Sequence, residues 1–345
     1  MIHKMETPKT KETGTPKDET LAERVRIAIE IYDLIPATGK VVFALSDGGD
    51  SRALLHILTV LGYQDRLVPV IVDMGYTTFN ATPAKVAVEA LGYQPFVVNV
   101  HDETFQSLLD PKIRDKLKEQ LTQITQLDPS IDLATSPCRP CYASKRIALD
   151  FIAEHPETVI AAHNSKETNE PSVIIFGHHM DDSIDSLLKE FLFRIHAATG
   201  ETYSRPAFRS FVQGLKKSGK PQDAFAELSK LAEAGQYSTT EPISETKDGI
   251  RIVRPFVAAR VFKHYISAYI FNHQITGIKS GCPHSDDKSQ HTAREIVRDE
   301  LTQLVYPSTR NYFADLVMKG LNEKGEARAP RRRDDLVRYT GGKDI

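Results

Sequence analysis

Apolar and polar positions along the chain follow two alternating patterns, which predict strands and helices in turn. Short, mostly apolar runs lie at 40–45, 67–72, 95–100 and 173–176. Runs of this length without regular polar alternation are typical of strands buried on both faces of a parallel sheet. Apolar residues at helical spacing predict helices around these strands, at 21–35, 51–61, 83–91 and 181–195. The predicted fold class is therefore α/β, with a doubly wound parallel sheet.

Two segments interrupt this alternation. Residues 102–137 are polar and predicted to be helical, while residues 196–250 are rich in Gly and Pro and contain one predicted helix, near 221–233. A long segment of the second kind is more often a substrate cover or a binding loop than filler. Helical spacing returns at 258–271, 287–305 and 309–321. We therefore predict a single domain over 21–320 with helical insertions, chiefly at 196–250, between a disordered tail at 1–20 and a locally basic tail at 321–345.

Charge and composition narrow the class of protein. The 345 residues include 44 Lys and Arg against 46 Asp and Glu, so the formal net charge is −2. This balance excludes a wholly basic nucleic-acid coat and leaves polyanion binding to local patches. No window approaches the about 18 apolar residues of a membrane span, and the first twenty residues lack the apolar stretch of a secretory signal. Because the three cysteines also suit a reducing compartment, we expect a cytoplasmic location without membrane contact.

A loop of small residues follows the first predicted strand and leads directly into a helix. Small residues let a backbone approach a ligand closely, and the amides at a helix start attract an anion. The alternative is a tight turn in which Asp50 or Ser51 caps the helix. Neither the P-loop pattern nor the dinucleotide-binding pattern fits this loop. The candidate phosphate-binding residues are Ser46, Asp47, Gly48, Gly49, Asp50 and Ser51.

A second motif, Gly177-His178-His179-Met180-Asp181-Asp182, lies where the strand at 173–176 turns into a helix. Asp181 and Asp182 fall in the first helical turn, where carboxylates interact favourably with the helix dipole, so simple capping is one interpretation. Two histidines and two acids at a strand end are also well placed to hold Mg²⁺ or to move protons.

The three cysteines are Cys138 and Cys141, in a C-x-x-C pair, and Cys282 far downstream. The pair alone fits a redox couple, half of a zinc site or cluster ligands. A Cys₃His zinc site that includes His284 is one alternative, since structural zinc takes four ligands. Three thiolates without a fourth suit a 4Fe-4S cluster with one open iron, which can hold sulfide.

Taken in order, these motifs and Arg254-Pro255 resemble the tRNA 2-thiocytidine synthetase group of PP-loop ATP pyrophosphatases. The resemblance covers roughly 20–320, apart from the segments near 155–171 and 196–250. Asp47 departs from it, because it replaces the first glycine of the family's S-G-G-x-D-S loop. The fold implied is the adenine nucleotide alpha hydrolase (HUP-like) PP-loop domain. The activity implied is adenylation of a nucleobase carbonyl oxygen by ATP, with release of pyrophosphate, followed by displacement of AMP by sulfur carried on a 4Fe-4S cluster.

The resemblance also implies roles for residues in this chain. Asp73 is placed at the nucleoside part of ATP, and Gly177 and His178 are placed at the nucleotide. Lys145, Asp181 and Asp50 are the candidate catalytic residues, with Mg²⁺ held by Asp181 and Asp182. The cluster ligands are Cys138, Cys141 and Cys282.

The acceptor is less sharply indicated by the sequence. tRNA is favoured by the resemblance, whereas the lack of a strong basic field favours a free nucleobase, as in 6-thioguanine-type biosynthesis. A non-catalytic iron–sulfur sensor is a third hypothesis, since Asp47 disfavours phosphate binding. The sulfur donor is expected to be sulfide or a cysteine desulfurase, and relatives of this kind often form homodimers.

Overall fold

The computed structural model describes residues 16–46, 48–75, 81–126, 138–155, 173–186, 241–246, 249–275, 314 and 317–318. The side chains of 16–20, 125–126 and 138–139 are not among the described atoms. Several parts of the chain that the sequence analysis discusses therefore lie outside the described residues. They are Asp47, Cys282, His284, the insertion over 196–240, the tail at 321–345 and the helices expected at 221–233 and 287–305.

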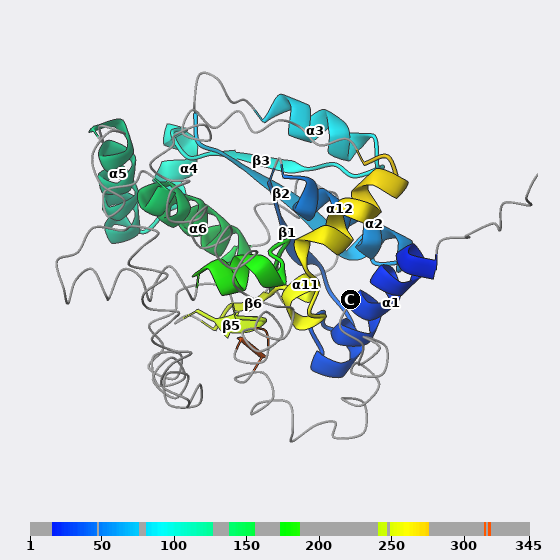
Figure 1. The fold of residues 1–345 in the computed structure, drawn as a ribbon. Helices are drawn as coiled ribbons and strands as arrows, with labels where there is room; N and C mark the ends of the chain where they lie inside the picture. The colour runs from blue at the N-terminus through cyan, green and yellow to red at the C-terminus, as the bar shows by residue number, and fades with distance from the viewer. Residues whose placement is uncertain are drawn as a thin grey trace, which may run out of the picture.

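A six-stranded sheet in the order β3-β2-β1-β4-β6-β5 forms the centre of the described structure (Figure 1). All neighbouring strands pair in parallel except β5 and β6. The predicted α/β class with a doubly wound sheet is confirmed, and the antiparallel edge strand makes the sheet mixed. The strands are β1 (Val41–Leu45), β2 (Leu67–Asp73), β3 (Phe96–Asn99), β4 (Val173–Phe176), β5 (Ile243–Glu245) and β6 (Arg251–Val253).

The first four strands lie where the apolar runs predict them, within a residue or two at each end. By contrast, β5 and β6 were not predicted. Each has three residues, too few to show a period, and β5 lies within the segment interpreted as a long excursion. Both are formed because β6 pairs with β4 in parallel and with β5 in antiparallel fashion.

Helices cover both faces of the sheet. They are α1 (Pro16–Tyr32), α2 (Gly49–Val60), α3 (Thr82–Glu89), α4 (Glu103–Leu108), α5 (Pro111–Gln126), α6 (Cys138–Glu154), α11 (Pro255–Ala258) and α12 (Lys263–Asn272), with a short 3₁₀ helix at Gln64–Arg66. The helix expected from residue 21 begins earlier, at Pro16. No element was predicted over 138–154, where α6 forms.

The prediction of one continuous helix over 258–271 is wrong. The chain forms α11, turns, and begins α12 at Lys263. Arg260 has a φ of 53°, in the left-handed region, which ends a right-handed helix. The turn matters for the site, because it places the first residues of α12 beside the loops described below.

Two apolar cores lie on opposite faces of the sheet, which is why the central strands β1 and β4 are apolar at every position. In β1, Val41, Phe43 and Leu45 join the core that contains α1, α2, α11 and α12. Val42 and Ala44 of the same strand pack into the core beneath α5 and α6. In the part of the chain that the structure describes, no helix is both long and apolar enough to cross a membrane.

Candidate active site

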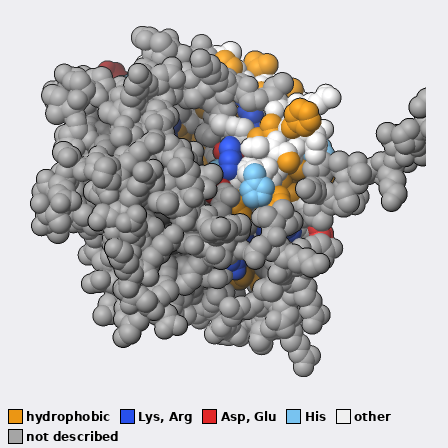
Figure 2. All heavy atoms as spheres, viewed as in Figure 1, with side chains coloured by type: hydrophobic (Ala, Val, Ile, Leu, Met, Phe, Trp, Pro, Cys, Tyr) orange, Lys and Arg blue, Asp and Glu red, His pale blue; other side chains and the backbone are white. Residues whose placement is uncertain are grey.

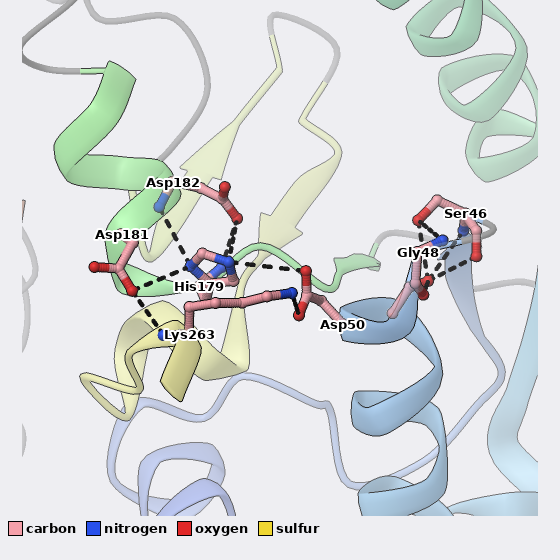
Figure 3. A network of polar contacts seen from close by, with 8 residues as sticks. Ser46, Gly48, Asp50, His179, Asp181, Asp182 and Lys263 are labelled. Carbon is pink, nitrogen blue, oxygen red and sulfur yellow. Dashed lines mark hydrogen bonds and ion pairs between the residues drawn. The ribbon is translucent and has the colours of Figure 1, made fainter. Parts of the chain in front are cut away.

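The loop between β1 and α2 is held in shape by its own two serines (Figure 3). The Ser51 hydroxyl donates to the Ser46 carbonyl at 2.8 Å, and the two hydroxyl oxygens lie 3.0 Å apart. The Gly48 amide donates to Ser46 Oγ at 3.3 Å. Gly48 is the N-cap residue of α2 and supplies no side-chain cap, so the interpretation of Asp50 or Ser51 as the cap is wrong. The first turn of α2 therefore keeps amides available for an anion.

Gly177 brings the end of β4 directly onto this loop. A Cβ atom added at Gly177 would lie 2.6 Å from Ser51 Cα and 2.9 Å from Ser51 N. Both are backbone atoms that cannot rotate away. The predicted site residue thus has a steric reason to be glycine, and the two motifs separated by more than a hundred residues are in contact.

His179 lies at the centre of a polar network at the carboxyl ends of β1 and β4 (Figure 3). Its side chain is 2% exposed. Its backbone amide donates to Asp182 Oδ2 at 3.1 Å, and the Asp182 amide donates to His179 Nδ1 at 3.3 Å. These two bonds cap the helix over 180–186 reciprocally. Because Nδ1 accepts, the proton of a neutral ring lies on Nε2, 3.4 Å from Asp182 Oδ2 and 3.8 Å from Asp50 Oδ2.

Asp181 acts on a different helix from Asp182. Its Oδ2 accepts the backbone N–H of Lys263 at 2.6 Å, so it caps α12. The capping interpretation is therefore correct for Asp182, whereas Asp181 caps a different helix from the one expected. Through Lys263 and His179, both acids belong to the network that includes Asp50.

Lys263 is a site residue that the sequence analysis missed. Its Nζ forms a hydrogen-bonded ion pair with Asp50 Oδ1 across 213 residues of chain. The Lys263 side chain is 45% exposed, whereas that of Asp50 is 24% exposed. Figure 2 shows basic, acidic and histidine side chains grouped near the centre of this face, beside an apolar patch. No pattern in the sequence singles out this lysine, since its position depends on the unpredicted turn before α12.

Asp73 ends β2 at the same edge of the sheet. Its Oδ1 accepts the Gly75 amide at 2.8 Å, which fixes the carboxylate within a tight turn. Gly75 has a φ of 68°, and a Cβ there would lie 2.7 Å from the His101 ring. The expected role of Asp73 at a nucleoside stays a prediction.

The cysteine motif begins α6. Cys141 is half-buried with a free thiol, and Lys145 follows one helical turn later on the same side of the helix. The side chain of Cys138 and the whole of Cys282 lie outside the description, so the convergence of three thiolates stays a prediction. Among the described residues, no group of three or more His, Cys, Asp or Glu side chains is arranged to hold a metal ion.

The surroundings of α6 nevertheless fit a negatively charged group. Arg254 is 0% exposed, and its Nε and Nη2 atoms have no hydrogen-bond partner. The buried hydroxyl of Tyr142, next to Cys141 in the sequence, also has none. Orphaned buried donors of this kind are costly unless an acceptor binds to them.

The turn at 177–182 fits Mg²⁺ less well. Asp181 and Asp182 each use one carboxylate oxygen as a helix cap. Mg²⁺ bound to a nucleotide, however, needs only one or two protein carboxylates.

A doubly wound α/β sheet with a glycine-containing strand-to-helix loop at its carboxyl edge defines a class of architecture that binds phosphorylated ligands at that edge. Within this class, the sequence is similar to two tRNA-cytidine(32) 2-sulfurtransferases. The protein from Geotalea daltonii is 28% identical over 177 residues, and the one from Geotalea uraniireducens is 27% identical over the same length. The resemblance inferred from the order of the motifs is thereby confirmed.

The match covers 50% of this chain and 57% of each relative, so the chain spans little more than half the length of the curated relatives it matches. No protein-family profile matches the chain. Among solved structures, the U34-tRNA thiolase NcsA from Methanococcus maripaludis with its [4Fe-4S] cluster superposes with a TM-score of 0.49 and 16% identity, over 93% of this chain and 89% of that one.

Proposed function

We propose that this chain is an ATP-dependent sulfurtransferase that replaces a carbonyl oxygen of a nucleobase in tRNA with sulfur. The observation that carries the proposal is the similarity to tRNA-cytidine(32) 2-sulfurtransferases, together with the contact between the loop at 46–51 and the turn at 177–182. A tRNA acceptor is preferred to a free base because both curated relatives are named for tRNA.

The first half-reaction activates the base. The carbonyl oxygen attacks the α-phosphorus of ATP, an O–P bond forms, and the bond to the β-phosphate breaks to release pyrophosphate. Pyrophosphate is a good leaving group only when its charge is offset, and preorganised donors provide that stabilisation. In this chain the donors are the first-turn amides of α2 and the ammonium of Lys263, which lies within reach of the same loop.

The second half-reaction introduces sulfur. A hydrosulfide equivalent forms a C–S bond at the activated carbon, the C–O bond breaks, and AMP leaves with the oxygen. A 4Fe-4S cluster, when bound by Cys138, Cys141 and Cys282, supplies an open iron that carries the incoming sulfur. We assign to Lys145, on α6, the role of offsetting negative charge on the activated oxygen. Asp181 binds the backbone amide of Lys263, whose ammonium pairs with Asp50.

Replacing Lys263 with methionine is expected to weaken ATP binding by about tenfold or more. A hydrogen bond to a charged group contributes about 1.5–3 kcal/mol, and the variant also leaves Asp50 unpaired beside the phosphates. Calorimetric titration with ATP measures the effect. Lys85→Met is the matched control, since Lys85 is an exposed lysine that pairs with Glu89 on α3. Equal ATP affinity in both variants would contradict the role of Lys263.

Release of pyrophosphate tests the proposal against a non-catalytic sensor. The protein, purified without oxygen, is incubated with ATP and either bulk tRNA or free nucleobases. We expect pyrophosphate release that depends on tRNA. Pyrophosphate release with free bases but not with tRNA would show that the acceptor is a small heterocycle. The absence of pyrophosphate release under every condition would rule out an adenylating enzyme.

A further inference from the structure

Arg254 is a buried cation, and the one carboxylate whose charge is seen to act on it, that of Glu241, does not form an ion pair with it. Its Nη1 donates to the Glu241 carbonyl at 2.6 Å and to Ser244 Oγ at 3.2 Å, while Nε and Nη2 donate to nothing. In the described part of the chain, no ion pair involves this residue. Burial lowers the pKa of Arg254 to about 10, so the guanidinium stays charged at neutral pH. A buried charge of this kind is unfavourable without a counter-charge.

Besides Glu241 and Ser244, the groups around Arg254 come from α6 and the end of β4. The guanidinium carbon lies 5.7 Å from the centre of the Phe176 ring, and that of Arg146 lies 5.8 Å from the same ring. Arg146 is neutralised by Asp150, whose Oδ1 lies 2.6 Å from its Nη2. Arg254 has no ion pair of this kind among the described residues, and the only carboxylate charge that acts on it is the more distant one of Glu241.

Tyr142 adds a second buried polar group. Its hydroxyl makes no hydrogen bond of standard geometry, and it lies close enough to Arg254 for a weak hydrogen bond between them to raise the pKa of the guanidinium, which leaves the hydroxyl proton free to donate. Tyr142 and Arg146 are four residues apart on α6 and so lie on one side of the helix. Cys141 and Lys145, each one residue earlier, lie on the adjoining side of the same helix.

We propose that Arg254 and Tyr142 form a buried receptor for anionic sulfur beside the Cys-x-x-Cys motif of α6. The inference rests on the proposed function, which brings two forms of anionic sulfur to this place. Thiolates that ligate an iron–sulfur cluster leave it with net negative charge, and hydrosulfide is itself an anion. Both accept hydrogen bonds from the uncommitted Arg254 nitrogens and the Tyr142 hydroxyl, and hydrogen bonds and nearby charge set the potential of such clusters.

The reduction potential of the cluster is the first readout. When the cluster takes up one electron from an electrode, its negative charge grows, so loss of a nearby cation makes reduction harder. We expect a lower potential in Arg254→Met, and smaller shifts in the same direction in Arg254→Lys and Tyr142→Phe, with iron content unchanged. Tyr93→Phe is the matched control, because the Tyr93 hydroxyl has a partner in Thr59 at 2.6 Å, and we expect no shift there.

Sulfide binding to iron-free protein separates the two sources of anionic sulfur. Calorimetric titration with sodium sulfide is expected to show binding that Arg254→Met weakens about tenfold. Sulfide binding in the wild type assigns the receptor to hydrosulfide. A shift in potential without sulfide binding assigns it to the cluster itself.

Stability distinguishes the receptor from a structural arginine. Arg254→Met loses two hydrogen bonds but also removes a buried charge that forms no ion pair among the described residues, so the iron-free variant should be about as stable as wild type. A structural arginine predicts lower stability, an unchanged potential and unchanged sulfide affinity, and that combination would overturn the proposal. If Arg254→Met fails to fold, the reduction potential and the sulfide affinity of Tyr142→Phe test the proposal in its place. A wild-type protein that holds no iron contradicts the proposed function instead, and the sulfide titration still decides on the receptor.

Discussion

Gly177→Ala is expected to destabilise the protein and to weaken ATP binding at least tenfold. The added methyl group would lie 2.6 Å from Ser51 Cα, so either β4 or the start of α2 must move. Overpacking against backbone costs about 1–3 kcal/mol of unfolding free energy, and here the displaced segment is the phosphate loop itself. Denaturant unfolding and calorimetric titration with ATP measure the two effects.

The control for this variant is Gly62→Ala. Gly62 has a φ of 84° but no atom within 4 Å of an added Cβ, so alanine there strains the backbone without touching the loop. We expect a comparable loss of stability with unchanged ATP affinity. If Gly177→Ala binds ATP as tightly as Gly62→Ala, the contact between the two motifs is not needed for nucleotide binding.

Cys141→Ala is expected to abolish both the brown colour of the purified protein and the formation of thiolated product. Cys141 is half-buried on α6 and packs at the edge of an apolar core, so alanine there preserves the fold while removing a ligand. Pyrophosphate release should persist, since the phosphate loop is built from other elements. Iron and sulfide analysis, optical absorption and product mass spectrometry measure the outcome, and Cys138→Ala and Cys282→Ala are expected to behave in the same way.

His284→Ala distinguishes a cluster from a Cys₃His zinc site. A cluster held by three cysteines keeps its iron in this variant, whereas a zinc site loses its fourth ligand and its metal. A triple-cysteine variant that still produces thiolated nucleoside would refute the cluster hypothesis itself.

The fold was predictable where a local pattern decides the structure. The runs that form β1, β2 and β4 are apolar, apart from Asp73 at the end of β2, because these strands face a core on both sides, whereas β3 at the edge of the sheet is only partly buried. The strands β5 and β6 were missed, since three residues carry no period and their formation depends on pairing with β4. The break before α12 was missed because a single residue, Arg260, takes a left-handed conformation inside an otherwise helical pattern.

The site was predictable as motifs but not as contacts. The sequence names the loop at 46–51 and the turn at 177–182, and the packing of Gly177 against Ser51 shows why they act together. Lys263 reaches Asp50 only because the chain turns before α12, so no local signal identifies it. Arg254 was recognised as part of a motif, whereas its complete burial and its uncommitted nitrogens are properties of the folded chain alone.

The most direct test of the account is the fate of sulfur in tRNA. The protein is reconstituted with iron and sulfide without oxygen and incubated with ATP, sulfide and unmodified tRNA, and the nucleosides are then analysed by mass spectrometry. We expect one nucleoside in which sulfur replaces oxygen, formed only with ATP and lost in Cys141→Ala. Sulfur incorporation without ATP, or its absence from every nucleoside while the cluster and pyrophosphate release are intact, would contradict the account.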